Sequence, residues 1–444
     1  MKQPYNPLLL TASFLLLAAA FAASSAAQDV AFVNANVITM EDDAVMAGAT
    51  VLVSGDRIVA LGTDVAVPEG ATRIDATDKY LVPGLAEMHG HVPRPDEPAQ
   101  YTEDVLFLYV ANGITTVRGM LGAPGQLELR QRANSSEIVA PTLYLAGPSF
   151  SGGSIDSPEQ AVEKVRRQKE EGWNLLKIHP GLTLAEYDAM AETARETAMR
   201  FGGHVPADVG LMHAIDQGQE TFDHIDGYVE YLRTVNADEI DEEALAYAIQ
   251  RTIEAGAWVV PTMALWQNIF GYIDADVLDS YAELKYMPPG VVESWSRRTR
   301  RVHASPDFDR AAAEKLIAWR MHVLGALHRA GARILMGTDA PQVYSVPGFS
   351  LHRELAHMVE AGMDPHAILV SGTVNVGEYF ANEDTFGTII AGSRADLLLV
   401  EGNPLDDVAH LASLSGVMVR GQWLSRKVLD TGLAAIAARY EPSP

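Results

Sequence analysis

The sequence predicts an α/β protein, in which a TIM-like (β/α)8 barrel is joined to a small β-sandwich domain formed from both chain ends. The chain has 444 residues, which is long enough for such a barrel with an appended domain. Its middle alternates apolar segments with helix signals, and short β segments lie near both ends. We therefore expect the barrel over residues 83–383 and the sandwich over residues 28–82 and 384–432.

Residues 1–27 have the pattern of a secretory signal peptide. Lys2 is the only charged residue before Asp29, and an apolar run ends in small residues, among which Ser25 and Ala27 suit a cleavage site. An uncleaved membrane anchor is the alternative, but the run is short for a span of roughly 20 residues and has no basic flank. We therefore expect a periplasmic or secreted protein with no stable membrane association after cleavage.

Both ends of the remaining chain contain segments expected to form the small sheet domain. The N-terminal set is Val30–Val37, Thr50–Val53, Arg57–Leu61 and Thr72–Ile74. The C-terminal set is Gly387–Gly392, Ala395–Val400 and Gly416–Val419. Because these β-rich ends flank a long α/β middle, we expect them to pair with each other.

Eight apolar segments in the middle of the chain predict the strands of the barrel. In order they are Leu85–Met88, Ile114–Arg118, Thr142–Ala146, Leu175–Ile178, Phe201–Val205, Thr221–Ile225, Trp258–Pro261 and Arg333–Gly337. Eight consecutive strand–helix units favour a barrel, and a three-layer doubly wound sheet is the structural alternative. The connection over residues 263–332 is too long for a single link, and we interpret it as a helical insertion that forms a lid after the seventh strand.

Two helices between these strands have clear start signals. Ser157, followed by a proline, caps one helix, which we expect to stop by Gly172. Thr183 and Glu186 form a capping box that opens a second helix, expected to run to Gly202.

The composition excludes several classes of function. The chain has 33 Lys and Arg against 58 Asp and Glu, a formal net charge of −25. Binding to nucleic acid or to anionic membranes needs a basic surface and is therefore disfavoured. Cysteine is absent, which excludes disulfides, thiol nucleophiles, iron–sulfur clusters and cysteine-ligated zinc. Any metal must be held by nitrogen and oxygen ligands.

Side chains able to bind metal lie where several predicted strands end. His89 and His91 are two residues apart on the first strand, so both point to the same side. The others end the fourth, fifth, sixth and eighth strands: Lys177, His204, His224 and Asp339. Strand ends build the active sites of such barrels. Each histidine alone is as well explained by a structural role, but the set predicts a metal centre.

Lys177 lies inside an apolar strand, where a buried cation is costly. Burial lowers the pKa of its ammonium group and frees a neutral amine, which can add carbon dioxide to become a carbamate anion. Two divalent cations would stabilise that anion. A snorkelling or ion-paired lysine is the alternative.

With these residues the chain resembles the amidohydrolase superfamily, whose binuclear metal centre uses the same ligand types. Three local contexts are also similar: Leu81–Gly84 before the histidine pair, Gly337–Ala340 around the aspartate, and Gly392–Leu397 in the returning sheet. Within the superfamily the chain is most similar to the imidazolonepropionase-like branch, which includes Xaa-Pro dipeptidases. The resemblance covers nearly all of the chain after residue 27.

The resemblance implies two divalent metal ions, with zinc as the first expectation and manganese or cobalt as alternatives. The implied ligands are His89, His91 and Asp339 for one ion, His204 and His224 for the other, and carboxylated Lys177 as the bridge. A hydroxide that bridges the ions would attack the amide carbonyl. Asp339 would then act as general base and afterwards as general acid.

Three further residues are candidates for substrate contacts. Arg118, at the end of the second strand, could pair with a substrate carboxylate, and a structural ion pair is the alternative. His179 has the same strand parity as Lys177, so it could point into the barrel mouth. Tyr228 follows His224 by four residues and could act as a catalytic hydrogen-bond donor to the oxyanion or bind substrate, with packing under the loop as the alternative.

Together these features predict an exported hydrolase of amide bonds in short peptides or N-acyl amino acids, similar to dipeptidases or carboxypeptidases. Hydrolysis of lactams, lactones or xenobiotic amides at the same centre is one alternative. A secreted barrel that binds small ligands without turnover is an alternative of another class. The sequence leaves a homo-oligomer open.

Overall fold

The computed structural model of the chain describes residues 29–441. The predicted signal peptide, residues 1–27, lies outside the described residues. Within them, no helix is both long enough and apolar enough to cross a lipid bilayer.

Eight parallel strands, all in the positions that the sequence predicts, form the barrel. They are β6 (Leu85–Gly90), β7 (Ile114–Gly119), β8 (Thr142–Leu145), β9 (Leu175–Ile178), β10 (Arg200–Gly203), β11 (Thr221–Asp223), β12 (Trp258–Val260) and β13 (Arg333–Ile334). Regular pairing gives two sheets, β6–β7–β8 and β9 to β13. Backbone hydrogen bonds span both gaps: Gly147 N–H donates to Leu175 O at 3.0 Å, and Met88 N–H donates to Met336 O at 2.8 Å. The strands thus form a ring rather than an open sheet.

Helices surround these strands and make the α/β alternation complete. They are α1 (Ala99–Ala111), α2 (Gln126–Asn134), α3 (Pro158–Glu171), α4 (Leu184–Glu196), α5 (Gly210–Asp216), α6 (Tyr228–Val235), α7 (Glu242–Glu254), α12 (Phe349–Glu360), α13 (Pro365–Gly372) and α14 (Val374–Tyr379). The two predicted helix starts are confirmed. Ser157 Oγ accepts the Gln160 N–H at the start of α3, and Thr183 and Glu186 form the capping box of α4.

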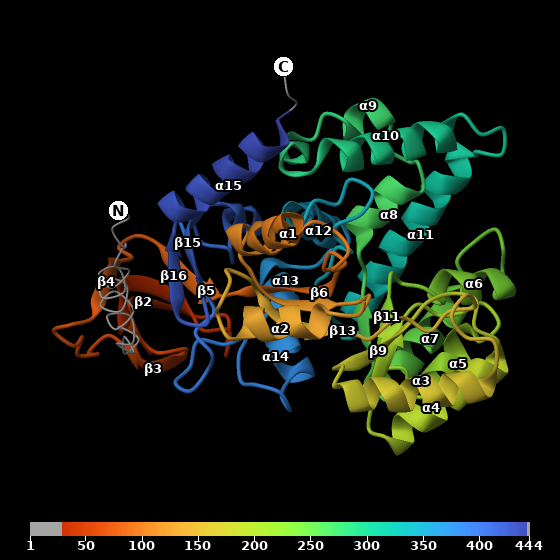
Figure 1. The fold of residues 1–444 in the computed structure, drawn as a ribbon, viewed down its shortest axis with the longest axis horizontal. Helices are drawn as coiled ribbons and strands as arrows, with labels where there is room; N and C mark the ends of the chain where they lie inside the picture. The colour runs from red at the N-terminus through yellow and green to blue at the C-terminus, as the bar shows by residue number, and fades with distance from the viewer. Residues whose placement is uncertain (1–28, 442–444) are drawn as a thin grey trace, which may run out of the picture.

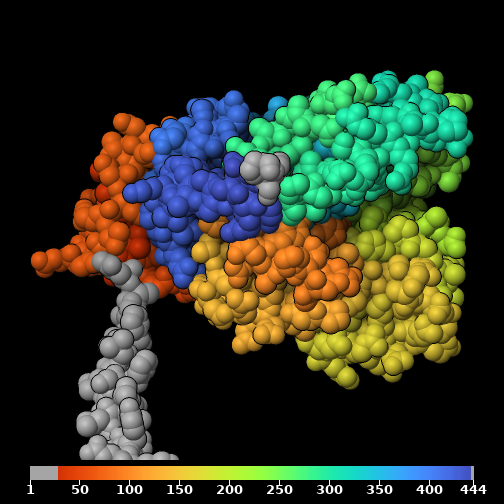
Figure 2. Space-filling view, turned by 45° about the horizontal axis from the view of Figure 1, so that its top comes forward, coloured from red at the N-terminus to blue at the C-terminus, as the bar shows by residue number. Residues whose placement is uncertain are grey.

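The segment between β12 and β13 is helical, as predicted. It contains α8 (Met263–Ile269), α9 (Ala275–Leu278), a 3₁₀ turn η1 (Ala282–Tyr286), α10 (Pro289–His303) and α11 (Arg310–Arg329). Figure 1 shows α9 and α10 together at one edge of the molecule, and Figure 2 shows the green to teal residues as one continuous region of its surface. Its action as a lid stays a prediction.

Both chain ends contribute to one mixed sheet of eight strands beside the barrel (Figure 1). Its strands are β1 (Val30–Ile38), β2 (Val45–Ser54), β3 (Arg57–Gly62), β4 (Thr72–Asp75), β5 (Tyr80–Pro83), β14 (Leu397–Val400), β15 (Leu414–Val419) and β16 (Gln422–Ser425). Antiparallel pairing of β5 with β14 joins the two ends, as predicted. The chain also forms a 3₁₀ turn η2 (Val408–Ala412) and a last helix α15 (Arg426–Tyr440).

Alternating side chains of β14 connect this sheet to the barrel. Leu397 and Leu399 belong to the core of the sheet domain, whereas Leu398 and Val400 belong to the large core of the barrel. Since successive residues of a strand point to opposite faces, one strand contributes to both cores. Burial on both sides fixes the sheet against the barrel.

Two local predictions are wrong. Gly387–Gly392 is not a strand but a loop, in which Ile389 N–H bonds to Thr39 O and Gly392 N–H bonds to Ile58 O. The helix α4 ends at Glu196 rather than at Gly202, because the backbone turns left-handed at Ala198 (φ 50°) and β10 starts two residues later.

Candidate metal centre

The six predicted ligands all lie at the carboxyl ends of barrel strands. His89 is within β6 and Lys177 within β9, where both side chains are buried. The other four follow the strands β6, β10, β11 and β13: His91, His204, His224 and Asp339. Parallel strands place their carboxyl ends at the same edge of the barrel, so residues distant in sequence meet there.

Distances between side-chain atoms show that the six residues form one cluster. Lys177 Nζ lies 3.0 Å from His89 Nε2, and His91 Nε2 lies 2.5 Å from Asp339 Oδ1. The other carboxylate oxygen of Asp339 is 3.6 Å from His224 Nε2. The His224 ring lies between those of His89 and His204, with centroid distances of 4.3 and 4.5 Å. The convergence predicted from the strand ends is therefore present in the structure.

A hydrogen bond at Nδ1 orients each of the three more buried imidazoles. His89 Nδ1 lies 2.6 Å from Asp223 Oδ2, and His204 Nδ1 lies 2.6 Å from Asp226 Oδ2. His224 Nδ1 lies 2.7 Å from Thr262 Oγ1. A ring held at Nδ1 presents Nε2 to the centre, which is how metal-binding histidines are commonly fixed.

The cluster fits divalent cations. His224 Nε2 is buried and makes no hydrogen bond with any residue that the structure describes. Such an unsatisfied buried nitrogen is unfavourable unless it has another partner, and a cation is a suitable one. His89, His91 and Asp339 offer ligand atoms within 4.8 Å of one another. This donor set of imidazole nitrogens and carboxylate oxygen suits zinc, manganese or cobalt.

The Lys177 side chain is fully buried, and its environment favours the neutral amine. Burial lowers the pKa of Lys177 to about 8, although the carboxylates of Asp223 and Asp339 act in the opposite direction. A substantial fraction of Lys177 is therefore uncharged near neutral pH. This is the form that can react with carbon dioxide.

Arg118 does not reach substrate, which corrects the prediction of a carboxylate contact. Its side chain is fully buried inside the barrel and donates to Met88 O, to Thr221 and to the carboxylate of Asp223, the last at 3.0 and 3.2 Å. Burial alone would raise the pKa of Asp223, but the charge of Arg118 lowers it overall. Arg118 thus makes the structural ion pair that was the alternative, and it keeps the partner of His89 ionised.

Tyr228 is not at the metal centre, which corrects its prediction as a catalytic and substrate-binding residue. It begins α6, is fully buried, and its hydroxyl lies 2.6 Å from Thr252 Oγ1 on α7. Its ring packs edge-on against Phe222. The backbone turns left-handed at His224 and Ile225, so the residues that follow are directed into the core.

His179 lies beside the cluster, as its strand parity predicts. Its ring is half-buried and stacks on the ring of His204, with the centroids 5.1 Å apart. Burial, together with the Lys177 ammonium, lowers the pKa of His179 to about 2, so its imidazole is neutral. Contact between His179 and substrate stays a prediction.

The sequence interpretation missed the residues that hold the ligands in place. Asp223 and Asp226 flank His224 in the chain, and this Asp-His-x-x pattern with a second aspartate was a usable signal. Glu87 had no signal, although its buried carboxylate accepts the N–H groups of His89 and Thr338 at 3.0 and 2.7 Å. Burial raises the pKa of Glu87 to about 8.

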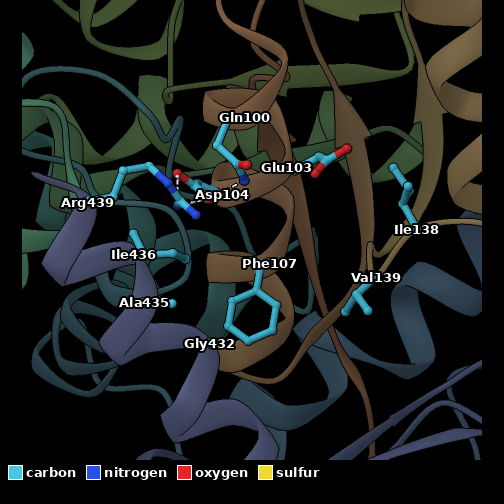
Figure 3. A pocket seen from close by; sticks show the side chains of 10 residues that line it. All are labelled: Gln100, Glu103, Asp104, Phe107, Ile138, Val139, Gly432, Ala435, Ile436 and Arg439. Atoms are coloured by element: carbon cyan, nitrogen blue, oxygen red, sulfur yellow. Dashed lines mark hydrogen bonds and ion pairs between the residues drawn. The ribbon is translucent and has the colours of Figure 1, made fainter.

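A cavity of about 320 Å³ lies elsewhere, between α1 and α15 (Figure 3). None of the six metal-centre residues lines it. Its arginine, Arg439, is already paired with the carboxylate of Asp104 at 2.6 and 2.7 Å. We assign no function to this cavity.

Comparison with protein-family models gives a match to the Amidohydrolase family over residues 80–424. Among curated proteins, adenine deaminase 3 of Rhizobium meliloti is 22% identical over 412 residues, which are 89% of this chain and 57% of that protein. The dihydroorotase of Mycobacterium leprae is 40% identical over 55 residues, 12% of each chain. The present chain thus spans little more than half the length of the first of these relatives.

Solved structures share the fold. A Xaa-Pro dipeptidase with bound methionine has a TM-score of 0.69 at 21% identity, covering 90% of this chain and 100% of that one. Bottromycin amidohydrolase has a TM-score of 0.75 at 23% identity, covering 94% and 91%. A prolidase-like protein from Bifidobacterium longum has a TM-score of 0.70 at 19% identity, covering 92% and 99%.

Proposed function

Because this chain belongs to the amidohydrolase family, we propose that it is a metal-dependent hydrolase of carbon–nitrogen bonds, acting on the amide bonds of short peptides or N-acyl amino acids. One observation carries the proposal. Six potential ligands from five separate strands converge at the carboxyl end of the barrel, and a buried imidazole nitrogen there makes no hydrogen bond with a described residue. A structural histidine cluster would not need that arrangement.

In the proposed centre two divalent ions are held by the chain's own donors. The assignments are His89, His91 and Asp339 for one ion, His204 and His224 for the other, and carboxylated Lys177 between them. When bound, such ions polarise a carbonyl and increase the acidity of water. Asp223, Asp226 and Thr262 keep the imidazoles oriented.

Asp339 is the proposed proton carrier. Its two carboxylate oxygens lie between the imidazoles of His91 and His224, at 2.5 and 3.6 Å from their Nε2 atoms. From that position it can take a proton from the attacking water and give it to the leaving amine nitrogen. The reaction then produces a carboxylate and a free amine.

Peptide substrates are favoured by the names of the solved neighbours, which include a Xaa-Pro dipeptidase and a prolidase-like protein. A second candidate, hydrolysis of a cyclic amide, is supported by the local match to dihydroorotase at 40% identity. Both reactions use the same centre, so the loops of the barrel mouth decide between them.

A substrate panel tests the proposed function. Zinc-loaded protein assayed with dipeptides, N-acyl amino acids, lactams, lactones and dihydroorotate is expected to hydrolyse a linear amide with a kcat/KM about 100-fold above any cyclic substrate. Chelated protein serves as the control and should be inactive. Preference for a cyclic substrate would favour the second candidate. No turnover of any compound by fully metal-loaded protein would favour a ligand-binding barrel.

We also propose export of the protein to the periplasm or the medium. This rests on the pattern of residues 1–27, and N-terminal sequencing of the mature protein tests it. Cleavage is expected after Ala27. A mature protein that retains Met1 and the apolar run would contradict it.

A further inference from the structure

Arg320 on α11 reaches the metal centre from the helical insertion. It is 96 residues from His224 in sequence, yet only 3% of it is exposed. Its Nη1 donates to the carbonyl oxygen of His224, and its Nη2 lies 3.3 Å from Asp226 Oδ1. One guanidinium therefore contacts both the backbone of a proposed ligand and the carboxylate that orients another.

The backbone that Arg320 contacts is in an unfavourable conformation. His224 and Ile225 both have positive φ angles, 68° and 59°. L-residues avoid this left-handed region, and a β-branched residue such as Ile225 avoids it most strongly. Such a conformation persists only where the surroundings impose it. The hydrogen bond from Arg320 to the His224 carbonyl is one contact that imposes it.

The Arg320 guanidinium is itself held in one orientation. Its Cζ atom lies 4.4 Å from the centroid of the Trp266 ring and 5.7 Å from that of Phe270, both in or just after α8. Trp266 also packs edge-on against the His224 ring, with the centroids 5.5 Å apart. Cation–π contact on one side and two oxygen acceptors on the other leave the guanidinium little freedom.

We propose that Arg320 is a positioning residue of the metal centre. It fixes the carboxylate of Asp226, and through it the imidazole of His204, while it holds the turn that carries His224. The inference rests on the proposed metal centre and extends it to the inserted helices, which thereby control the geometry of the second cation site. Lysine cannot replace Arg320, because its single ammonium lacks the planar fork that spans both acceptors.

The test compares Arg320→Lys and Arg320→Gln with Arg297→Lys, an exposed arginine of α10 that pairs only with Glu293 among the described residues. In zinc-loaded full-length protein, both Arg320 variants are expected to hold closer to one ion than two. We expect kcat to fall about 10- to 100-fold, with KM changed less than about threefold. The His204 Nδ1–H signal, seen by NMR of histidine-labelled protein, should shift or be lost through exchange with water. Arg297→Lys should match wild type in all three.

Two ions, normal kcat and an unchanged His204 signal in both Arg320 variants would overturn the inference, even if thermal stability fell. This outcome would leave Arg320 a purely structural residue. Wild-type protein that binds two ions but hydrolyses nothing would instead contradict the proposed function. In that case the ion count and the His204 signal still decide the role of Arg320.

Discussion

Lys177→Ala is expected to remove at least one of the two metal ions and to lower kcat about 1,000-fold or more. Lys177 is the only predicted ligand able to place an anion between the two sets of imidazoles, and its Nζ lies 3.0 Å from His89 Nε2. Loss of the charge stabilisation that a metal ion gives is worth several kcal/mol, and about 4 kcal/mol corresponds to about 1,000-fold in rate. Metal analysis and kcat measurement in buffer with bicarbonate check both effects.

Lys164→Ala is the matched control for this prediction. Lys164 is also a buried lysine, with its pKa lowered to about 8 by burial, but its ammonium group donates to Ser149 O outside the cluster. This variant is expected to keep both ions. A fully active Lys177→Ala enzyme in bicarbonate-free buffer would refute the bridging role of Lys177.

Asp339→Asn is expected to keep most of the bound metal while lowering kcat by about 100- to 10,000-fold, the range typical of a lost general base. The amide oxygen can still contact a cation, and His89 and His91 remain in place. An amide cannot accept the proton of the attacking water, however, so turnover should fail at that step. Metal content and steady-state kinetics on the same preparation separate the two effects.

Tyr228→Phe is the control for Asp339→Asn. Because the Tyr228 hydroxyl faces Thr252 in the core, its removal should change stability by about 1 kcal/mol and leave kcat unaltered. If Asp339→Asn turns over at the wild-type rate, Asp339 is not the proton carrier.

The barrel strands were predictable because each is buried and apolar. Strands such as Leu175–Ile178 are short apolar runs between polar segments, and fully buried parallel strands have this composition. The strand period of two also placed His89 and His91 on one side and put Lys177 inside the barrel. Local chemistry was sufficient for these predictions.

Predictions failed where the backbone left regular structure or where the partner was distant in sequence. Strand parity could not be extended past β11, because the left-handed turn at His224 and Ile225 redirects the chain, and Tyr228 enters the core. Arg118 was correctly placed at a strand end, but its partner Asp223 lies 105 residues away. Only the assembled barrel shows that this arginine is already paired.

The central claim is that the cluster at the barrel mouth binds two divalent ions, and counting those ions tests it most directly. Wild-type protein should be reconstituted with zinc in the presence of bicarbonate, desalted, and measured by elemental analysis against protein concentration. The account predicts two zinc ions per chain. One ion or none per chain would contradict it.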